Sequence, residues 1–531
     1  MDKGERGEDV KHFNVTGLCM PEQDYMADIS GKVKQIRNMA DAGEYFVINR
    51  ARQYGKTTTL QALKNNMNEA YIVSRISFEG VGGTFFTSEA NFCSGFDDLF
   101  GKSLKFSSAS ADDCIFWKEY AVKQDSFLRL SEKITDFCQD RKVVLIIDEV
   151  DQASDNQVFL QFLGMLREKY LSRKMGEDFT FFSVILAGVY DIKNIKLRMI
   201  QKGYSILSEG EMKFNSPWNI AVNFDVDMSF SIQEISSMLS EYEQEHHTGM
   251  DIQGTAAEIW NYTRGYPFLV SRICREVDMT GLGWDALGIQ MAVKAILAEK
   301  NTLFDDIAHH LENNEELRSF MYELLILGQE KPYERTNSVI DLAATFGFIY
   351  NENGRAVVDN RMFEVKIANY FVSKNMDDKE QVKISGVLTE DVIQDNHFVM
   401  EYALQKFSEH YEGLYENVKN RKFLEEHGRI LFLTYLRPLI NGKGFYHIES
   451  RTNSERRMDV VVDFGAEQYI LELKRWYGNK KHEEAYEQLY EYLESKCAKE
   501  GYLLTFDFRR QKSRRMEWVT YKGKRIFDVV V

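Results

Sequence analysis

The order of apolar and polar positions predicts two regions of alternating strands and helices, separated by a mainly helical region. In the first region, strands are predicted at residues 45–48, 71–78, 143–147 and 181–187, with helix-forming segments between them, and the runs at 143–147 and 181–187 are strongly apolar. Such runs are typical of parallel strands that are buried on both faces. The pattern therefore predicts an α/β fold whose core is a parallel sheet.

From about residue 216 the strand pattern fades and helical periodicity replaces it. Helices are predicted at residues 229–242, 255–262, 320–327 and 338–346, and a turn leads into another helix at 261–276. A hairpin follows, with Asn353 and Gly354 at its turn. Helices followed by a hairpin are the outline of a winged helix. A winged helix here would either contact DNA or serve as a structural lid or docking module. We favour the lid or docking module over DNA contact.

Beyond this region, the polar and weakly patterned residues 373–385 predict a linker, which we extend to 388. Long helices are predicted from 389 to 440, and strand–helix alternation returns from there to the C-terminus. The predicted domains are therefore a P-loop domain (1–215), a helical lid with a winged-helix-like module (216–372), the linker (373–388) and a C-terminal α/β domain (389–531).

Composition narrows the class of protein. A chain of 531 residues with 44% hydrophobic residues and five prolines is typical of several globular domains. No apolar run reaches 18 residues and the N-terminus is charged, so we expect a cytoplasmic protein without a membrane span. The six scattered cysteines include no CxxC pair, which predicts reduced thiols and no zinc site. The net charge of −16 argues against a general nucleic-acid coat protein.

A phosphate-binding loop is predicted between the first strand and the following helix, within INRARQYGKTTTL at residues 48–60. Gly55, Lys56 and Thr57 supply the small turn residue, the phosphate-binding lysine and the magnesium-binding hydroxyl of such a loop. Arg50 stands where the first glycine of GxxxxGK[ST] is usual. The nucleotide-binding residues predicted here are Arg50, Gln53, Tyr54, Gly55, Lys56, Thr57 and Thr58.

Two acids at the tip of the apolar run VVLII complete this prediction. Asp148 is expected to bind Mg²⁺ together with Thr57, and Glu149 to polarise the water that attacks the γ-phosphate. The alternative is an acidic loop after a buried strand. No polar sensor is evident at the end of the next strand, and Arg198 or Arg264 are candidates by residue type alone.

A second centre is predicted near the C-terminus, where MDVVVDF is followed by YILELK. Glu472 and Lys474 share one face of a strand that is otherwise apolar, and burying such charges without a task is costly. With Asp459 they form a D…ExK pattern suited to holding Mg²⁺, or Mn²⁺, against a phosphodiester. The alternative is a structural Glu–Lys pair in a domain that does not cut.

Supporting residues are predicted around this pattern. Gln488, followed by Tyr492, lies on the next helix. Glu426 lies on the helix before the strands, and Glu449 precedes Asp459 in the sequence. Residues 509–525 carry eight Lys and Arg against one acid, which indicates either a phosphate-binding patch or a solvated strand pair.

Together these motifs, with FNVTGLCMPEQDYM, SPWNI and TRGYPFLV, resemble an AAA-ATPase-like domain that precedes a PD-(D/E)XK nuclease domain in many bacterial proteins. In that family an arginine in place of the first loop glycine is usual. The resemblance also links Gln488 and Tyr492 to the QxxxY signature of some nucleases of this fold. It implies that a glutamate on the helix before the strands assists the metal, for which we favour Glu426, with Glu449 as its competitor. The residue expected before Asp459 in this family is proline, and this chain has Met458 there instead.

The resemblance implies an ATP-binding and ATP-hydrolysing protein that controls a Mg²⁺-dependent DNA endonuclease, in defence against foreign DNA or in mobile-element maintenance. The alternative is a STAND-type scaffold, in which nucleotide state governs homo-oligomerisation and the C-terminal domain binds nucleic acid without cutting it. No short motif separates DNA from RNA as the partner.

Overall fold

The computed structural model describes residues 11–122, 124–153, 156–189, 218–377, 392–394, 397–416, 425–440, 444–449, 459–465, 467–509 and 515–531, without the side chains of 375–377, 410–416, 425–427, 438, 447, 449 and 459. The chain forms two compact units. Unit 1 comprises Met1–Glu245, Tyr266–Ser271 and Thr345–Gly347, and unit 2 comprises His246–Gly265, Arg272–Ala344 and Phe348–Val531. No described helix is long and apolar enough to cross a membrane.

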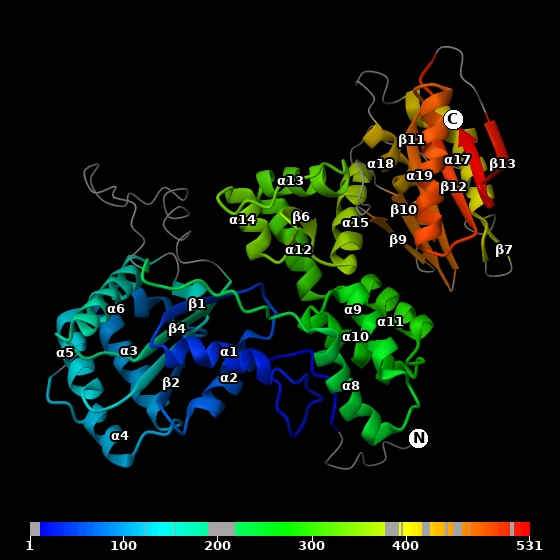
Figure 1. The fold of residues 1–531 in the computed structure, drawn as a ribbon. Helices are drawn as coiled ribbons and strands as arrows, with labels where there is room; N and C mark the ends of the chain where they lie inside the picture. The colour runs from blue at the N-terminus through cyan, green and yellow to red at the C-terminus, as the bar shows by residue number, and fades with distance from the viewer. Residues whose placement is uncertain are drawn as a thin grey trace, which may run out of the picture. The chain divides into compact units, whose positions relative to one another are not determined.

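Unit 1 is built on a parallel sheet, as predicted (Figure 1). Its strands are β1 (Tyr45–Asn49), β2 (Ile72–Ser77), β3 (Val143–Asp148) and β4 (Ser183–Gly188). Their order is β1-β4-β3-β2, so the strand that precedes the phosphate loop lies at one edge and the strand with the acids lies inside. Every residue of β3 and β4 is buried, because helices cover both faces of the sheet.

Different helices pack on the two faces of this sheet. One face packs on a phenylalanine-rich core contributed by α3 (Glu89–Leu104), α5 (Phe127–Cys138) and α6 (Gln157–Met175). The short elements η1 (Gly83–Phe86), α4 (Ala111–Lys118) and η2 (Val150–Ala153) complete this side. The other face carries α1 (Ser30–Asp41) and α2 (Lys56–Met67), which pack against each other. Helix α1 was not predicted, because buried Lys32 interrupts its apolar stripe of Val33, Ile36 and Ala40.

The helical region includes α8 (Ile232–His246), which belongs to unit 1 except for its last residue, and α10 (Pro267–Thr280), of which Pro267–Ser271 belong to unit 1. Unit 2 contains α9 (Ile252–Thr263), α11 (Ala286–Ala298), α12 (Thr302–Asn313), α13 (Glu315–Leu325) and, except for its last residue, α14 (Ser338–Thr345). The predicted hairpin is confirmed as β5 (Ile349–Glu352) and β6 (Arg355–Val358). Asn353 and Gly354 have φ of 52° and 85°, which is the backbone that a two-residue hairpin turn requires.

The predicted linker begins too early. Helix α15 (Arg361–Asp377) continues through residues 373–377, and the rest of the predicted linker lies outside the described residues. The helix continues because Phe371 and Val372 are buried and the Ser373 hydroxyl hydrogen-bonds both Asn369 O and Arg437. The long helices predicted from 389 are also preceded by a short hairpin of β7 (Ile393–Gln394) and β8 (His397–Phe398).

The C-terminal part of unit 2 is a six-stranded sheet of order β13-β14-β12-β11-β10-β9. After α17 (Met400–Glu416), the chain runs through α18 (Glu425–Ile440), β9 (Gly444–Glu449), β10 (Asp459–Phe464), β11 (Glu467–Arg475), α19 (Asn479–Ser495), β12 (Glu500–Phe506), β13 (Arg515–Tyr521) and β14 (Lys524–Val530). Strands β9, β10 and β11 pair antiparallel, whereas β12 is parallel to β11 and β14. Helix α19 packs on the face that presents Val461, Ile470, Leu503 and Ile526.

Candidate nucleotide site and carboxylate row

The predicted phosphate loop connects the end of β1 to the start of α2. Gly55 is the N-cap of α2 and has a φ of 72°, a conformation that favours glycine. Lys56 is the first residue of the helix and Thr57 the second. The free N–H groups at this helix start and the helix dipole attract anions, so the local geometry suits a phosphate.

Lys56 is held inside this loop. Its side chain is 7% exposed, and Nζ donates to Arg50 O at 3.0 Å and Ala51 O at 2.9 Å. Burial lowers the pKa of Lys56, although the nearby carboxylates of Glu149, Asp151 and Asp148 oppose this shift. Because the two carbonyls are weak partners for a cation, an anion at the helix start would be a better one.

The two predicted acids follow β3, as expected. Asp148 is its last residue and is buried, while Glu149 has a φ of 54° and is partly buried. One carboxylate oxygen of Asp148 accepts the Glu149 N–H at 3.0 Å, and the other accepts Arg75 Nη2 at 2.8 Å. Burial raises the pKa of Glu149, and Lys56 opposes the shift. A carboxyl group of this kind suits a general base.

The side chain of Arg50, predicted to contact the nucleotide, makes contacts within the fold. Its guanidinium donates to Asn49 O at 2.9 Å and Val226 O at 2.8 Å, and it lies 5.1 Å from the centre of the Phe224 ring. These contacts fasten the start of the loop to the segment that precedes α8. They favour a structural role for the side chain of Arg50.

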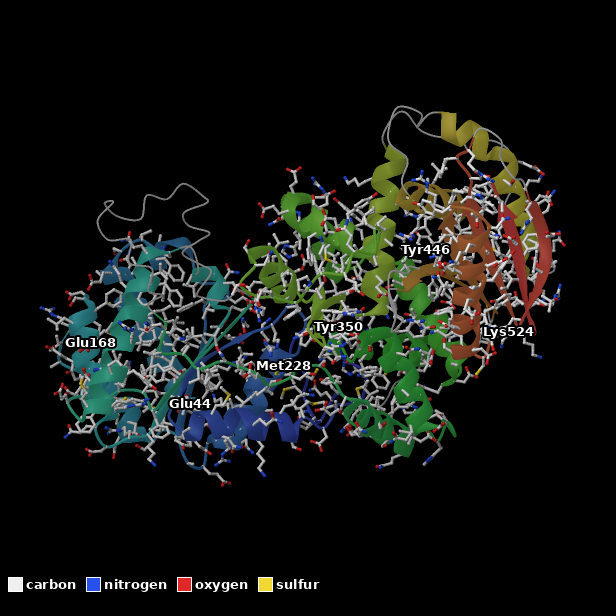
Figure 2. All side chains as sticks on the ribbon, turned by 45° about the horizontal axis from the view of Figure 1, so that its top comes forward. Glu44, Glu168, Met228, Tyr350, Tyr446 and Lys524 are labelled. Carbon is white, nitrogen blue, oxygen red and sulfur yellow. The ribbon has the colours of Figure 1, made fainter. Side chains whose placement is uncertain are left out.

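A cavity of about 350 Å³ adjoins the loop within unit 1. Gln53, Tyr54, Gly55 and Thr58 line it from the loop side. The opposite walls are the segment 14–19 and mainly apolar side chains near α8 and α10, among them Met228 (labelled in Figure 2), Phe230, Met238 and Phe268. An apolar cavity that opens on an anion-binding helix start suits a nucleoside phosphate.

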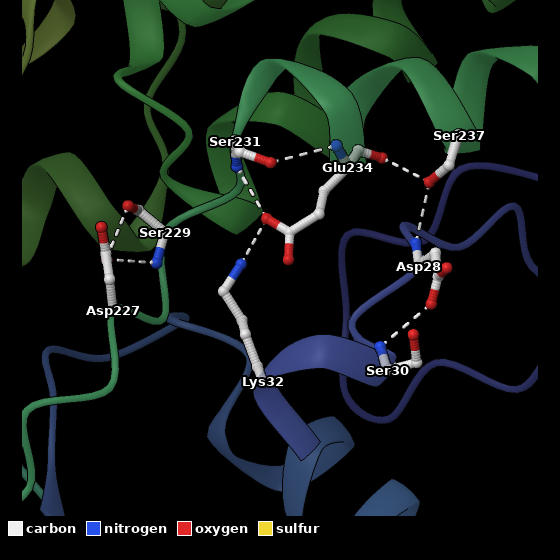
Figure 3. A network of polar contacts seen from close by, with 8 residues as sticks. All are labelled: Asp28, Ser30, Lys32, Asp227, Ser229, Ser231, Glu234 and Ser237. Atoms are coloured by element: carbon white, nitrogen blue, oxygen red, sulfur yellow. Dashed lines mark hydrogen bonds and ion pairs between the residues drawn. The ribbon is translucent and has the colours of Figure 1, made fainter. Parts of the chain in front are cut away.

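A polar network fixes one wall of this cavity (Figure 3). Lys32, which lines the cavity, pairs with Glu234 of α8. Glu234 also accepts the Ser231 N–H at 2.7 Å, and the Ser231 hydroxyl accepts the Glu234 N–H at 3.2 Å. This reciprocal pair caps α8, so the helix start and α1 are held together beside the cavity.

The end of β4, where a polar sensor was sought, carries a backbone contact. The Val189 N–H donates to Asp151 at 2.6 Å, which ties β4 to the acidic loop. Arg198 lies outside the described residues. Arg264 belongs to unit 2, where it pairs with Asp359 at 3.1 Å and lies 3.6 Å from the centre of the Tyr350 ring.

In the C-terminal sheet, three acidic positions form one row across neighbouring strands. Asp459 of β10 is directly opposite Glu472 of β11, and on its other side it is directly opposite Glu449 of β9. Neighbouring strands are about 4.8 Å apart, and directly opposite residues belong to the same face of a sheet. We define Glu449, Asp459 and Glu472 as the carboxylate row.

Glu472 and Lys474 are the members of this site whose side chains are described. Glu472 is 1% exposed and its carboxylate lies 2.5 Å from Lys474 Nζ. Apart from this ion pair, its two oxygens accept no hydrogen bond within the described structure. A buried carboxylate with unused acceptor capacity fits a site for a cation or water. The described side chains alone form no group of three metal-binding residues, and those of Glu449 and Asp459 are not among them.

The predicted supporting residues differ in how well their positions agree with a role beside the carboxylate row. Gln488 is on α19, and its buried Oε1 has no hydrogen-bond partner among the described groups. Position 426 is on α18, where nearby Gly428 approaches the Phe506 ring. Phe506 and Leu503 are three residues apart on β12, so they belong to opposite faces of the sheet, and Leu503 faces α19. Ile470 and Glu472 share the face that α19 covers, whereas Gly428 of α18 approaches Phe506 on the opposite face. This arrangement favours Glu449, a member of the carboxylate row, over Glu426 as the assisting acid.

In the basic segment 509–525, the described part has its charges paired. Each of its described cations pairs with a carboxylate: Arg509 with Asp507, Arg515 with Asp528, Lys522 with Glu487, Lys524 with Glu494, and Arg525 with Glu500. The remaining three, Arg510, Lys512 and Arg514, lie outside the described residues. The solvated strand pair is therefore the better interpretation of the described part.

Sequence reasoning missed two features of the nucleotide site. One is Arg75, whose partner Asp148 is 73 residues away. The other is the cavity wall formed by segment 14–19 and the start of α8. Their only local signal is a charged residue within the apolar run of β2 and methionines ahead of a helix. Neither signal identifies a partner without the tertiary structure.

Comparison with known proteins adds the family. The comparison with curated proteins found no match. Among solved structures, the Walker-type ATPase of Pyrococcus abyssi is 11% identical over 67% of this chain and 99% of its own, with a TM-score of 0.45. The Aeropyrum pernix ORC2 protein, in ADPNP–ADP complexes, is 12% identical over 70% of this chain and 99% of its own, with a TM-score of 0.37.

The Aeropyrum pernix ORC1 protein, solved in complex with DNA, is 11% identical over 66% of this chain and 94% of its own, with a TM-score of 0.28. Such scores are too low to indicate function. The sequence model of the AAA-like domain matches residues 22–371, which is more than half of the chain. This protein therefore belongs to the AAA-like domain family.

Proposed function

We propose that unit 1 binds ATP with Mg²⁺ and hydrolyses it. Lys56 would hold the β- and γ-phosphates, and Thr57 and Asp148 would hold the ion, which neutralises charge that develops on the phosphates. The Thr57 hydroxyl makes no hydrogen bond within the described structure, and Lys56 has only carbonyl partners, so both are available. The adjoining apolar cavity would take the base.

In the proposed hydrolysis Glu149 is the general base that orients and deprotonates the attacking water. Its raised pKa matches this role, because burial makes the carboxylate a stronger base than it is in water. Lys56 lies near enough to Glu149 to influence its pKa, and this proximity supports a γ-phosphate site next to the base.

We further propose that the C-terminal domain is a Mg²⁺-dependent DNA endonuclease of the PD-(D/E)XK type, with Mn²⁺ as an alternative ion. The observation that carries this proposal is the carboxylate row, with Lys474 next to Glu472. Asp459 and Glu472, with Glu449, would bind the ion against the scissile phosphate, while Lys474 orients the attacking water. The element order α18-β9-β10-β11-α19-β12 supports the resemblance to this nuclease fold.

The proposed coupling is that ATP state in unit 1 controls access to the carboxylate row. Its support is the presence of both sites in one chain. The domain limits that we propose are 1–215, 216–377 and 389–531, with the connection after α15. Defence against foreign DNA or mobile-element maintenance is the biological setting that we propose, and homo-oligomerisation is the accompanying hypothesis.

The test is cleavage of plasmid and single-stranded DNA in Mg²⁺ or Mn²⁺, with and without ATP. Wild type is compared with Asp459→Ala, and Lys480→Ala serves as a control because Lys480 is an exposed lysine of α19. Cleavage that depends on Asp459 and changes with ATP supports the proposal. Cleavage that persists in Asp459→Ala refutes the assignment of the carboxylate row.

A nucleotide-switched scaffold that binds nucleic acid without cutting it is the second candidate. The observation that favours it is that Lys474 already pairs with the buried carboxylate of Glu472, as in a structural ion pair. The same assay decides, because DNA binding with no cleavage in either metal ion supports the scaffold. RNA as the substrate is tested by replacing the DNA with RNA of the same sequence.

A further inference from the structure

The Asp148 carboxylate, which is expected to face Mg²⁺, already has a protein cation beside it. Arg75 Nη2 lies 2.8 Å from Asp148 Oδ2, and the two side chains are 17% and 3% exposed. This ion pair is therefore well shielded from solvent and poorly screened by salt. Arginine stays charged at every physiological pH, so the positive charge at this place is permanent.

The sheet register explains how Arg75 reaches this acid. In the parallel pairing of β2 with β3, Ser77 is opposite Asp148, and Arg75 stands two residues earlier on the same face of β2. On that face Arg75 Nη1 donates to Gln61 Oε1 of α2 at 3.1 Å. Gln61 follows Thr57 by four residues, so both lie on one side of α2. The guanidinium thus connects Asp148 to the helix of the phosphate loop, one turn after Thr57.

The ion pair between Arg75 and Asp148 affects the charge balance of the nucleotide site. Asp148, Glu149 and Asp151 lie close enough together that all three act on the charge of Lys56. A nucleoside triphosphate brings further negative charge to the same helix start, and a bound Mg²⁺ would normally offset this repulsion. Arg75 offsets part of it from within the protein, and the same positive charge repels a dication near Asp148.

We propose that Arg75 is a built-in counter-ion of the nucleotide site, which supports ATP binding without Mg²⁺ and lowers the affinity of the ATP-bound site for Mg²⁺. The inference rests on the proposed ATP site and adds the regulation of its metal dependence. Arg75 is a positioning residue in this scheme, since it acts through the carboxylate of Asp148. Nucleotide exchange would then be possible without prior metal loading.

The first measurement uses wild-type protein alone. ATP affinity is measured by titration calorimetry with excess Mg²⁺ and again with EDTA. The proposal predicts that the two dissociation constants differ by about tenfold or less, which is the scale of one neighbouring charge. A wild-type protein that binds ATP more than roughly a hundredfold more tightly with Mg²⁺ overturns the proposal.

The second measurement compares three variants. Arg75→Gln removes the charge and keeps a hydrogen-bonding group, Arg75→Lys keeps the charge, and Arg37→Gln is the control because Arg37 pairs with Asp41 on α1. In Arg75→Gln the ratio of the two dissociation constants is expected to grow about tenfold, through weaker binding in EDTA and tighter binding in Mg²⁺. Arg75→Lys is expected to stay within about threefold of wild type.

The results distinguish failure of the counter-ion role of Arg75 from failure of the proposed ATP site. An unchanged ratio in folded Arg75→Gln, or equal shifts in Arg75→Gln and Arg75→Lys, overturns the counter-ion role while leaving ATP binding intact. If wild type binds ATP in neither condition, the proposed ATP site itself fails. If Arg75→Gln does not fold, the wild-type ratio and the Arg75→Lys ratio still decide, because a large Mg²⁺ dependence in either contradicts the proposal.

Discussion

Replacing Lys56 by alanine tests the nucleotide site most directly. The Lys56 ammonium group donates to two loop carbonyls at 3.0 and 2.9 Å, which are neutral acceptors. A phosphate would replace them with charge-assisted bonds, each worth about 1.5–3 kcal/mol. The loss of one such bond corresponds to about 10- to 150-fold weaker ATP binding.

The fold is expected to survive this change. Lys56→Ala leaves the carbonyls of Arg50 and Ala51 without this donor, at a cost of about 1–3 kcal/mol. It also removes a buried amine whose lowered pKa shows that its charge is held at a cost. These effects oppose each other, so we expect the melting temperature to change by less than about 5 °C.

The assay is titration calorimetry with ATP, together with thermal unfolding followed by circular dichroism. Lys34→Ala is the matched control, because Lys34 is an exposed lysine of α1 in the same unit. It should bind ATP as wild type does. A folded Lys56→Ala protein whose ATP affinity stays within about threefold of wild type would refute the phosphate-loop reasoning.

Four further predictions concern single residues. Glu149→Gln should bind ATP yet hydrolyse it at least about 100-fold more slowly, and wild-type turnover in this variant would exclude Glu149 as the base. Since burial raises the pKa of Glu149 and the carboxylate is the active form, wild-type hydrolysis should fall as the pH drops through that raised pKa; a rate that stays constant on acidification until the protein unfolds would contradict this. Lys474→Ala should lose metal-dependent DNA cleavage but keep DNA binding, as measured by gel shift, and retained cleavage would count against the D…ExK centre. Gly428→Ala should destabilise the C-terminal domain by about 1–3 kcal/mol in urea unfolding, because the added Cβ would lie 2.6 Å from the Phe506 ring; an unchanged midpoint would show that Phe506 moves freely.

Local pattern was sufficient for the elements that carry the proposed chemistry. Apolar runs of four to eight residues are stable only when both faces are covered, so β1, β3 and β4 could be predicted as buried parallel strands. Gly55, Lys56 and Thr57 between a strand and a helix predicted a loop and a helix start, and the left-handed N-cap at Gly55 agrees with this because that conformation favours glycine. The i, i+2 spacing of Glu472 and Lys474 predicted that they share a strand face, and their ion pair agrees with that.

Helix α1 and the end of α15 show where local pattern failed. Lys32 interrupts the apolar stripe of α1, but its buried ammonium pairs with Glu234, 202 residues away. Polar residues after Val372 suggested a linker, but Ser373 is held by Arg437 of α18. In both places a long-range partner satisfies a polar group that the sequence alone presents as exposed.

The chain by itself therefore determined which segments are buried, where the phosphate loop turns, and which acids and lysines share a face, because these follow from periodicity within a few residues. Only the tertiary structure decided which acid stands opposite Asp459, what Arg50 contacts, and that Arg75 pairs with Asp148. Strand register and ion pairs across distant segments depend on how whole elements pack. Many pairings are compatible with the same local pattern, and packing selects one of them.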